Sequence, residues 1–82
     1  MSYIDSGRWK KTQSTQTFKF NVTFEKPPIV LVSPYWEGQH SEVGNTETID
    51  TIEQHQCTLV SGNEASNYLV NWVAIGEQEK KG

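Results

Sequence analysis

The sequence feature that most constrains the fold is the stretch from Thr15 to Tyr35, TQTFKFNVTFEKPPIVLVSPY. In its first half, from Thr15 to Phe24, large apolar residues alternate with polar ones, the period-two pattern of a strand with one buried face. Ile29 to Val32 then form an unbroken and mostly β-branched apolar run, which predicts a strand buried on both faces. Pro27 and Pro28 donate no backbone hydrogen bond, so we expect a connection between the two strands. The rest of the chain must supply their partners.

The remaining strands are predicted from shorter patterns separated by polar turns. We expect a first strand from Tyr3 to Trp9 and a last strand from Tyr68 to Gly76, in which Val70, Trp72 and Ala74 share one face. Two more strands are expected to begin near Thr46 and Gln54. The segment between them permits either a turn at Asp50-Thr51 or one longer strand.

Cys57, Leu59 and His55 are predicted to lie on one strand face, with Cys57 as a buried structural thiol. No helix of ten or more residues is predicted. Six short strands with polar turns indicate an all-β, six-stranded antiparallel β-sandwich.

The length of 82 residues predicts a single domain over residues 1–82, in which residues 77–82 form a frayed tail. A chain this small, with only 34% hydrophobic residues, buries only part of its surface when it folds alone. Such a chain is either a marginal monomer or a subunit that completes its core by association, and of these we expect the homo-oligomer.

The charge pattern and the apolar runs exclude other classes of partner. Seven basic against ten acidic residues give a net charge of −3, and no basic stripe is present, which disfavours nucleic-acid binding. No apolar run approaches the roughly 20 residues of a membrane span. We expect a soluble protein without a classical signal peptide, either cytoplasmic or secreted by a non-classical route.

Catalytic and metal-binding motifs are missing from the sequence. Cys57 and His55 are two residues apart, but they lack an orienting acid and an oxyanion loop. The histidines and acidic residues show no zinc or calcium spacing, so we expect no metal or other cofactor, and the acidic residues are interpreted as a solvated face. The sequence predicts a protein that is not an enzyme.

Polar and aromatic residues in the loops are better suited to binding. Tyr35 and Trp36 lead directly into a Gly-rich polar loop that contains His40 and Asn45, and Ser61 to Glu64 form a second polar loop. Aromatic rings stack on the apolar face of a sugar, and amide or imidazole groups hydrogen-bond its hydroxyls. Trp36 is equally suited to packing beneath its loop.

Several segments together resemble the H-type lectin domain, which is found in snail agglutinin and in the C-terminal part of discoidins. They are Ser6-Gly7, Asn21-Val22-Thr23-Phe24, the corner from Pro27 to Ser33, and the last strand from Val70 to Gly76. The resemblance covers most of the chain, and its motifs are mainly structural. It implies a six-stranded antiparallel sandwich that assembles as a parallel trimer and binds galactose or N-acetylgalactosamine.

The resemblance also implies where a sugar site would lie and how this chain departs from it. In the family the site uses a loop acid before the second strand, an Arg from the middle of the chain and a Trp-His pair, between neighbouring protomers at one end of the trimer. Here Gln13 falls near the acidic position, Val60 and Ser61 fall where Trp-His would stand, and no Arg follows Arg8. Cys57 matches a family cysteine whose disulfide partner is absent.

We therefore expect a retained scaffold with a rebuilt glycan site. Its candidate residues are Trp36, His40, Asn45, Asn63, Gln13 and Ser61. The expected function is that of a non-catalytic lectin that binds glycans multivalently as a homo-oligomer, with a trimer implied by the resemblance. The alternative is a trimerising assembly module without a sugar site.

Overall fold

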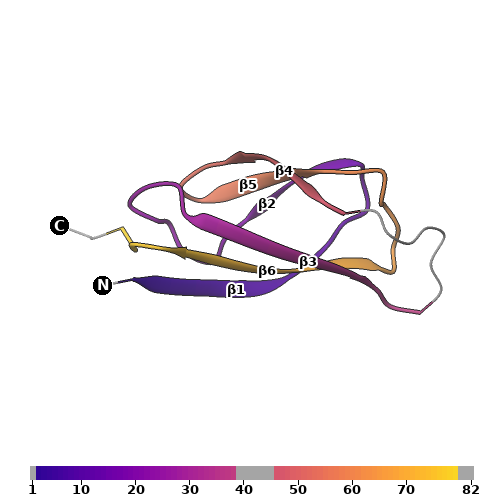
Figure 1. Cartoon of the computed structure of the whole chain (residues 1–82), viewed down its shortest axis with the longest axis horizontal. Helices are drawn as coiled ribbons and strands as arrows, with labels where there is room; N and C mark the ends of the chain where they lie inside the picture. Colours follow the sequence, from indigo (N-terminus) through magenta and orange to yellow (C-terminus); the bar gives the residue numbers. More distant parts are fainter. Residues whose placement is uncertain (1, 39–45, 80–82) are drawn as a thin grey trace.

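The computed structural model describes residues 2–38 and 46–79, and every regular element in them is a β-strand (Figure 1). The strands are β1 (Tyr3–Lys10), β2 (Thr15–Lys19), β3 (Ile29–Trp36), β4 (Thr48–Ile52), β5 (Gln56–Val60) and β6 (Tyr68–Gly76). The all-β class predicted from the sequence is confirmed.

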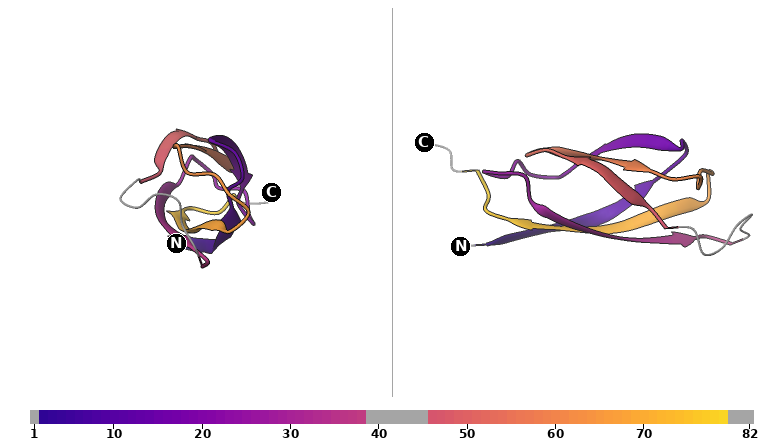
Figure 2. Two further views of the ribbon diagram at one scale, coloured as in Figure 1. Left: turned by 90° about the vertical axis from the view of Figure 1, so that its right-hand side faces the viewer. Right: turned by 45° about the horizontal axis from the view of Figure 1, so that its top comes forward.

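The six strands form two three-stranded antiparallel sheets, ordered β1-β6-β3 and β2-β5-β4. The chain crosses between the sheets after β1, β2, β3 and β5, so most hydrogen-bonded neighbours are distant in sequence, whereas the paired strands β4 and β5 are consecutive. Figure 2 shows the sheets as two walls of an elongated, β-sandwich-like body. The core lies between these walls.

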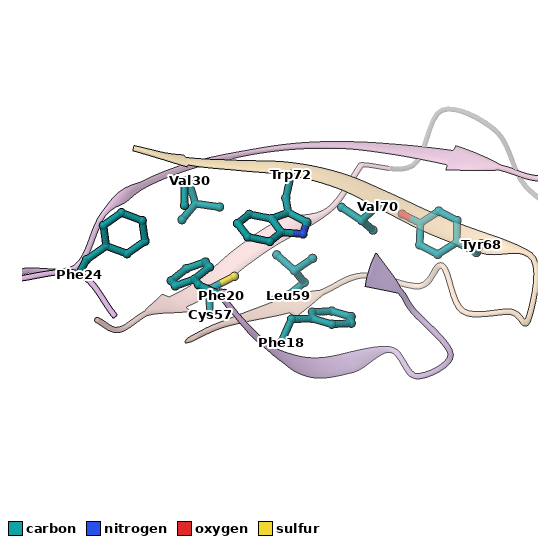
Figure 3. Packing of buried hydrophobic residues seen from close by; sticks show 10 residues of the cluster. Phe18, Phe20, Phe24, Val30, Cys57, Leu59, Tyr68, Val70 and Trp72 are labelled. Carbon is teal, nitrogen blue, oxygen red and sulfur yellow. The ribbon is translucent and has the colours of Figure 1, made fainter. Parts of the chain in front are cut away.

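β6 is the central strand of its sheet and supplies much of the core. Its residues alternate strictly, with Tyr68, Val70, Trp72 and Ala74 buried between the sheets. The inner face predicted for this strand is confirmed. Side chains of the other sheet, including Phe18, Cys57 and Leu59, lie opposite (Figure 3).

Three aromatic rings stack across the core. The ring of Trp9, on β1, lies 4.4 Å from Trp72 and 4.7 Å from Phe18, in near-parallel planes. Gly7 makes room for this stack, because a Cβ at that position would lie 3.0 Å from Nε1 of Trp72. A glycine is needed here for close packing of the strand on the indole.

The strand predicted from Thr15 to Phe24 ends early, at Lys19, so its second half is wrong. The carboxylate of Asp5, only 5% exposed, accepts hydrogen bonds from the main-chain N–H (2.7 Å) and side-chain amide (2.9 Å) of Asn21. These bonds hold Asn21 outside the ladder of β2. Phe24 is nevertheless fully buried, so the alternating pattern identified the inward residues but not the end of the strand.

β3 is not buried on both faces, which contradicts the interpretation of its apolar run. Val30 is buried, but Ile29 is 66% and Leu31 is 59% exposed. The strand lies at the edge of its sheet and alternates like any strand with one inner face. Its outer apolar residues need a different explanation.

The segment from Thr46 to Gln56 contains all of β4 and the turn into β5, so neither a turn at Asp50-Thr51 nor one longer strand describes it. β4 pairs with β5 through a turn closed by the Glu53 N–H and the Gln56 carbonyl (2.8 Å), and the register shifts between Ile49 and Thr51. Cys57 and Leu59 point inward as predicted. His55 is exposed in the turn and does not share their face.

The predicted frayed tail is wrong for residues 77–79. The N–H of Glu25 donates to the carbonyl of Glu77 (2.7 Å), and the N–H of Glu79 donates to the carbonyl of Thr23 (3.0 Å). These bonds tie the end of the described chain to the connection between β2 and β3. Residues 80–82 lie outside the described part of the chain.

Candidate functional site

All the predicted site residues that the structure describes lie at one end of the two sheets. This end, which we call the loop end, carries the connection between β1 and β2, the C-terminal end of β3, and the connection between β5 and β6 (Figure 1). Both described ends of the chain lie at the opposite end, which we call the terminal end. The arrangement gathers segments that are far apart in the sequence.

The loop end contains a completely buried lysine. Lys11 follows β1 and is fully inaccessible to solvent. Its Nζ donates to the main-chain carbonyl of Asn63 at 2.7 Å and to Ser61 Oγ at 3.2 Å, and lies 3.6 Å from Glu47 Oε1. A buried ammonium group is tolerated only when it is paired and hydrogen-bonded in this way.

Glu47 supplies the opposite charge, just before β4. Its side chain is also fully buried, and Oε2 accepts 2.5 Å hydrogen bonds from Ser61 Oγ and from the Tyr68 hydroxyl. The other oxygen, Oε1, has no hydrogen-bond partner in the described structure and faces Lys11. The Glu47 carboxylate is therefore stabilised by the ion pair with Lys11 and by the hydroxyl donors of Ser61 and Tyr68.

Tyr68 closes the network from the first residue of β6. Its hydroxyl accepts a 3.4 Å hydrogen bond from Asn63 Nδ2 while it donates to Glu47. The pKa of Tyr68 is raised well above its ordinary value. Burial is the largest cause, and the hydrogen bond to Glu47 is the second. The phenol is thus a neutral donor at every physiological pH.

The network joins four separate segments of the chain. These segments are the residue after β1 (Lys11), the residue before β4 (Glu47), the connection between β5 and β6 (Ser61 and Asn63) and the start of β6 (Tyr68). Main-chain bonds reinforce it, because the Lys11 N–H donates to the Tyr68 carbonyl at 3.1 Å and its own carbonyl accepts from Ala65 at 3.2 Å. The loop end is consequently rigid beneath its surface.

Trp36 lies beside this network, at the end of β3. Its ring centroid is 4.8 Å from that of Tyr68, its partner across the strand pair, and the side chain is half-buried. The indole packs against the core, and the residue as a whole keeps part of its surface accessible. The packing interpretation of Trp36 is confirmed, because its side chain packs against the core, while its role in sugar stacking stays a prediction.

Three other predicted residues have different environments. Gln13 is exposed in the connection between β1 and β2. Asn63 is only 3% exposed and Ser61 is half-buried, and both have side chains engaged in the network described above. Their polar groups thus support the loop end from within. His40 and Asn45 lie outside the described residues.

The sequence interpretation missed Lys11, Glu47 and Tyr68 as members of one cluster. Glu47 in particular was assigned to a solvated acidic face, which is wrong because its side chain is fully buried. A signal existed in the strand periodicity. Lys11 continues the inward positions of β1 after Gly7 and Trp9, and Glu47 precedes the inward Ile49 by two residues.

The environment of Cys57 does not suit it to act as a nucleophile with His55. Cys57 is completely buried, and burial raises the pKa of its thiol to about 11. The thiol is therefore protonated near neutral pH, whereas nucleophilic attack requires a thiolate. Among the described residues no group of three histidine, cysteine or carboxylate side chains could hold a metal ion.

A surface hollow of about 520 Å³ lies away from the predicted site. It is lined by residues 19–23, His55, Gln78 and Glu79, at the terminal end. None of the six predicted residues lines it. The hollow is therefore a second location where a ligand could bind, and a binding experiment must distinguish it from the loop end.

Comparisons of the chain with protein-family models, with curated proteins and with solved structures found no match. Among the described residues there is also no helix of the length and apolar character that crossing a membrane would require.

Proposed function

We propose that this chain is a non-catalytic carbohydrate-binding module that acts as a homo-oligomer, with its glycan site at the loop end. The observation that carries the proposal is the buried network of Lys11, Glu47, Ser61 and Tyr68, which fixes the segments on which the candidate residues stand. A rigid platform loses little conformational entropy when a ligand binds. A small entropy loss matters most for weakly bound ligands such as single sugars.

The chemistry of the surface residues supports a glycan as ligand. The half-buried Trp36 offers an aromatic ring for stacking, and the exposed Gln13 offers an amide that both donates and accepts hydrogen bonds. His40 and Asn45 belong to the proposed site on sequence grounds. The resemblance to H-type lectins favours galactose or N-acetylgalactosamine, without a metal or other cofactor.

Multivalency would supply affinity that one shallow site lacks. Several identical sites presented by one oligomer raise the avidity for a dense glycan surface by orders of magnitude. A trimer is the assembly that the resemblance favours.

A second candidate function is an assembly module without a sugar site. It is favoured by the internal engagement of Asn63 and Ser61, which leaves fewer polar groups of the loop end for a ligand. Under this proposal the domain contributes self-association alone to a larger structure.

A glycan array on the purified protein tests both proposals. We expect binding by the wild type, loss of binding in Gln13→Ala and in Trp36→Ala combined with His40→Ala, and no change in His55→Ala, which alters the hollow at the terminal end. Circular dichroism verifies that each variant is folded. Binding that survives the Trp36 and His40 substitutions would refute the proposed site, and a silent array with an oligomeric wild type would favour the assembly module.

A further inference from the structure

The outer face of the β1-β6-β3 sheet is apolar across its whole width near the terminal end. The register places Ile4 and Ile29 on either side of Ile75, and Leu31 beside Val73 in the next outward row. These five side chains point away from the core, because their strand neighbours point into it. They form one contiguous group, which we call the isoleucine face.

The isoleucine face is unusually open to solvent in a single chain. Ile4 is 64%, Ile29 66% and Leu31 59% exposed, while Ile75 and Val73 between them are half-buried. Single exposed apolar residues are ordinary, but a contiguous group spanning three strands marks an interaction site.

The outer face of the other sheet is a built-in comparison. There Thr17, Thr58 and Thr51 form the central row, and the hydroxyl groups of Thr17 and Thr58 are 2.8 Å apart. This is the polar surface that a solvated antiparallel sheet normally carries. Two outer faces of the same domain therefore differ in the way expected when only one of them is covered.

The charge distribution on the isoleucine face suits a second copy of the chain. The chain carries a net charge of −3, yet the only carboxylate within β1, β3 and β6 is that of Asp5, which is buried and bound by Asn21. The strands of this face therefore bring no exposed carboxylates together when two copies approach, and Glu25 and Glu77 beside the face have the cation of Lys26 among them. The cations Arg8 and Lys10 lie towards the loop end, at the rim.

A hollow beside the isoleucine face offers a place for an incoming side chain. It measures about 320 Å³, and the apolar Pro27, Ile29 and Ile75 line it together with the charged Glu25, Lys26 and Glu77. Protein–protein interfaces combine apolar contacts with polar groups.

We infer that the isoleucine face is the self-association surface of this protein, and that another copy of the chain covers it. The inference specifies the interface of the homo-oligomer and rests on that part of the proposed function, while it is independent of the glycan site. It also accounts for the apolar run of β3, whose two faces then contact the core and the neighbouring copy.

Sedimentation equilibrium of the full chain tests the inference with a matched pair of variants. Leu31→Asp and Thr17→Asp both place a carboxylate on an exposed, outward position of an edge strand. We expect an oligomeric mass for the wild type and Thr17→Asp, and the mass of one chain for Leu31→Asp. Ile4→Asp, on the opposite edge of the same face, is expected to dissociate the oligomer as well.

Near-ultraviolet circular dichroism of the Trp9 and Trp72 stack reports whether each variant retains its core. A wild type that is monomeric at all concentrations would overturn the inference, as would folded Leu31→Asp and Ile4→Asp proteins with unchanged oligomeric mass. Glycan binding does not enter this experiment. A failed array with the expected masses would therefore refute the glycan site alone.

Discussion

Lys11 Nζ lies 3.6 Å from Glu47 Oε1, and both side chains are completely removed from solvent. Removing one member of a buried pair leaves the other charge without compensation, which typically costs about 3–5 kcal/mol. We therefore expect Lys11→Met and Glu47→Gln each to lower the free energy of unfolding by several kcal/mol. Urea denaturation followed by tryptophan fluorescence measures the change.

The control for this pair is Lys19→Met, which removes an exposed lysine from the neighbouring strand β2. Such surface substitutions usually change stability by less than about 0.5 kcal/mol. If Lys11→Met behaved like Lys19→Met, the pair would contribute no net stability. The buried pair would then not be what holds the loop end in place.

Asp5 and Asn21 are expected to be energetically coupled. Asp5 accepts hydrogen bonds from the main chain and the side chain of Asn21, and from the N–H of Ser6 at 3.0 Å. Each hydrogen bond to a charged group is worth about 1.5–3 kcal/mol, so Asp5→Ala is expected to destabilise the fold by at least about 2 kcal/mol. A double-mutant cycle with Asn21→Ala should give a coupling of about 1 kcal/mol, and a coupling near zero would contradict the arrangement.

Gly7 is expected to be intolerant of even one added methyl group. In Gly7→Ala the new Cβ would lie 3.0 Å from Nε1 and 3.2 Å from two ring carbons of Trp72, which is itself stacked on Trp9. Overpacking of this kind costs typically about 1–3 kcal/mol. Thermal unfolding monitored by circular dichroism measures the loss.

The matched control is Gly62→Ala, because a Cβ at Gly62 would meet nothing within 4 Å. That substitution is expected to be neutral or slightly stabilising, since alanine restricts the unfolded chain. Equal melting temperatures for the two variants would mean that the indole moves aside without cost.

The β-strands could be predicted largely from periodicity, because burial of one face imposes a period of two on the chain. This is clearest in β6, where each inward residue from Val70 to Ala74 was identified. The end of β2 was not predictable in the same way. It depends on a long-range contact between Asp5 and Asn21, to which a local pattern is insensitive.

The apolar run at Ile29–Val32 illustrates a different limit. Apolar residues produce the same sequence pattern whether they face the core of their own chain or the surface of another copy. The sequence therefore predicts that both faces of β3 are apolar, but it does not distinguish the face toward the core from an outer face that another copy would cover. For the loop end, the polar residues Lys11 and Glu47 resembled surface charges, because a buried ion pair is defined by contacts between distant segments.

Cys57 makes the stability of the fold sensitive to alkaline pH. Burial raises the pKa of its thiol from an ordinary value of 9.0 to about 11. Between these pH values the unfolded chain releases the thiol proton while the folded chain retains it, so the unfolded state binds fewer protons and stability falls as pH rises. The contribution of Cys57 is constant below about pH 9 and decreases by roughly 2 kcal/mol towards pH 11.

The measurement compares urea denaturation of the wild type and Cys57→Ala at a series of alkaline pH values. Cys57→Ala is less stable at neutral pH, because it leaves a small cavity between the sheets. The difference between the two proteins is expected to shrink as pH rises from 9 to 11, since only the wild type has the Cys57 thiol, whose proton the unfolded chain releases first. A difference that stays constant over this range would show that the thiol is accessible to water, and would contradict its position in the core.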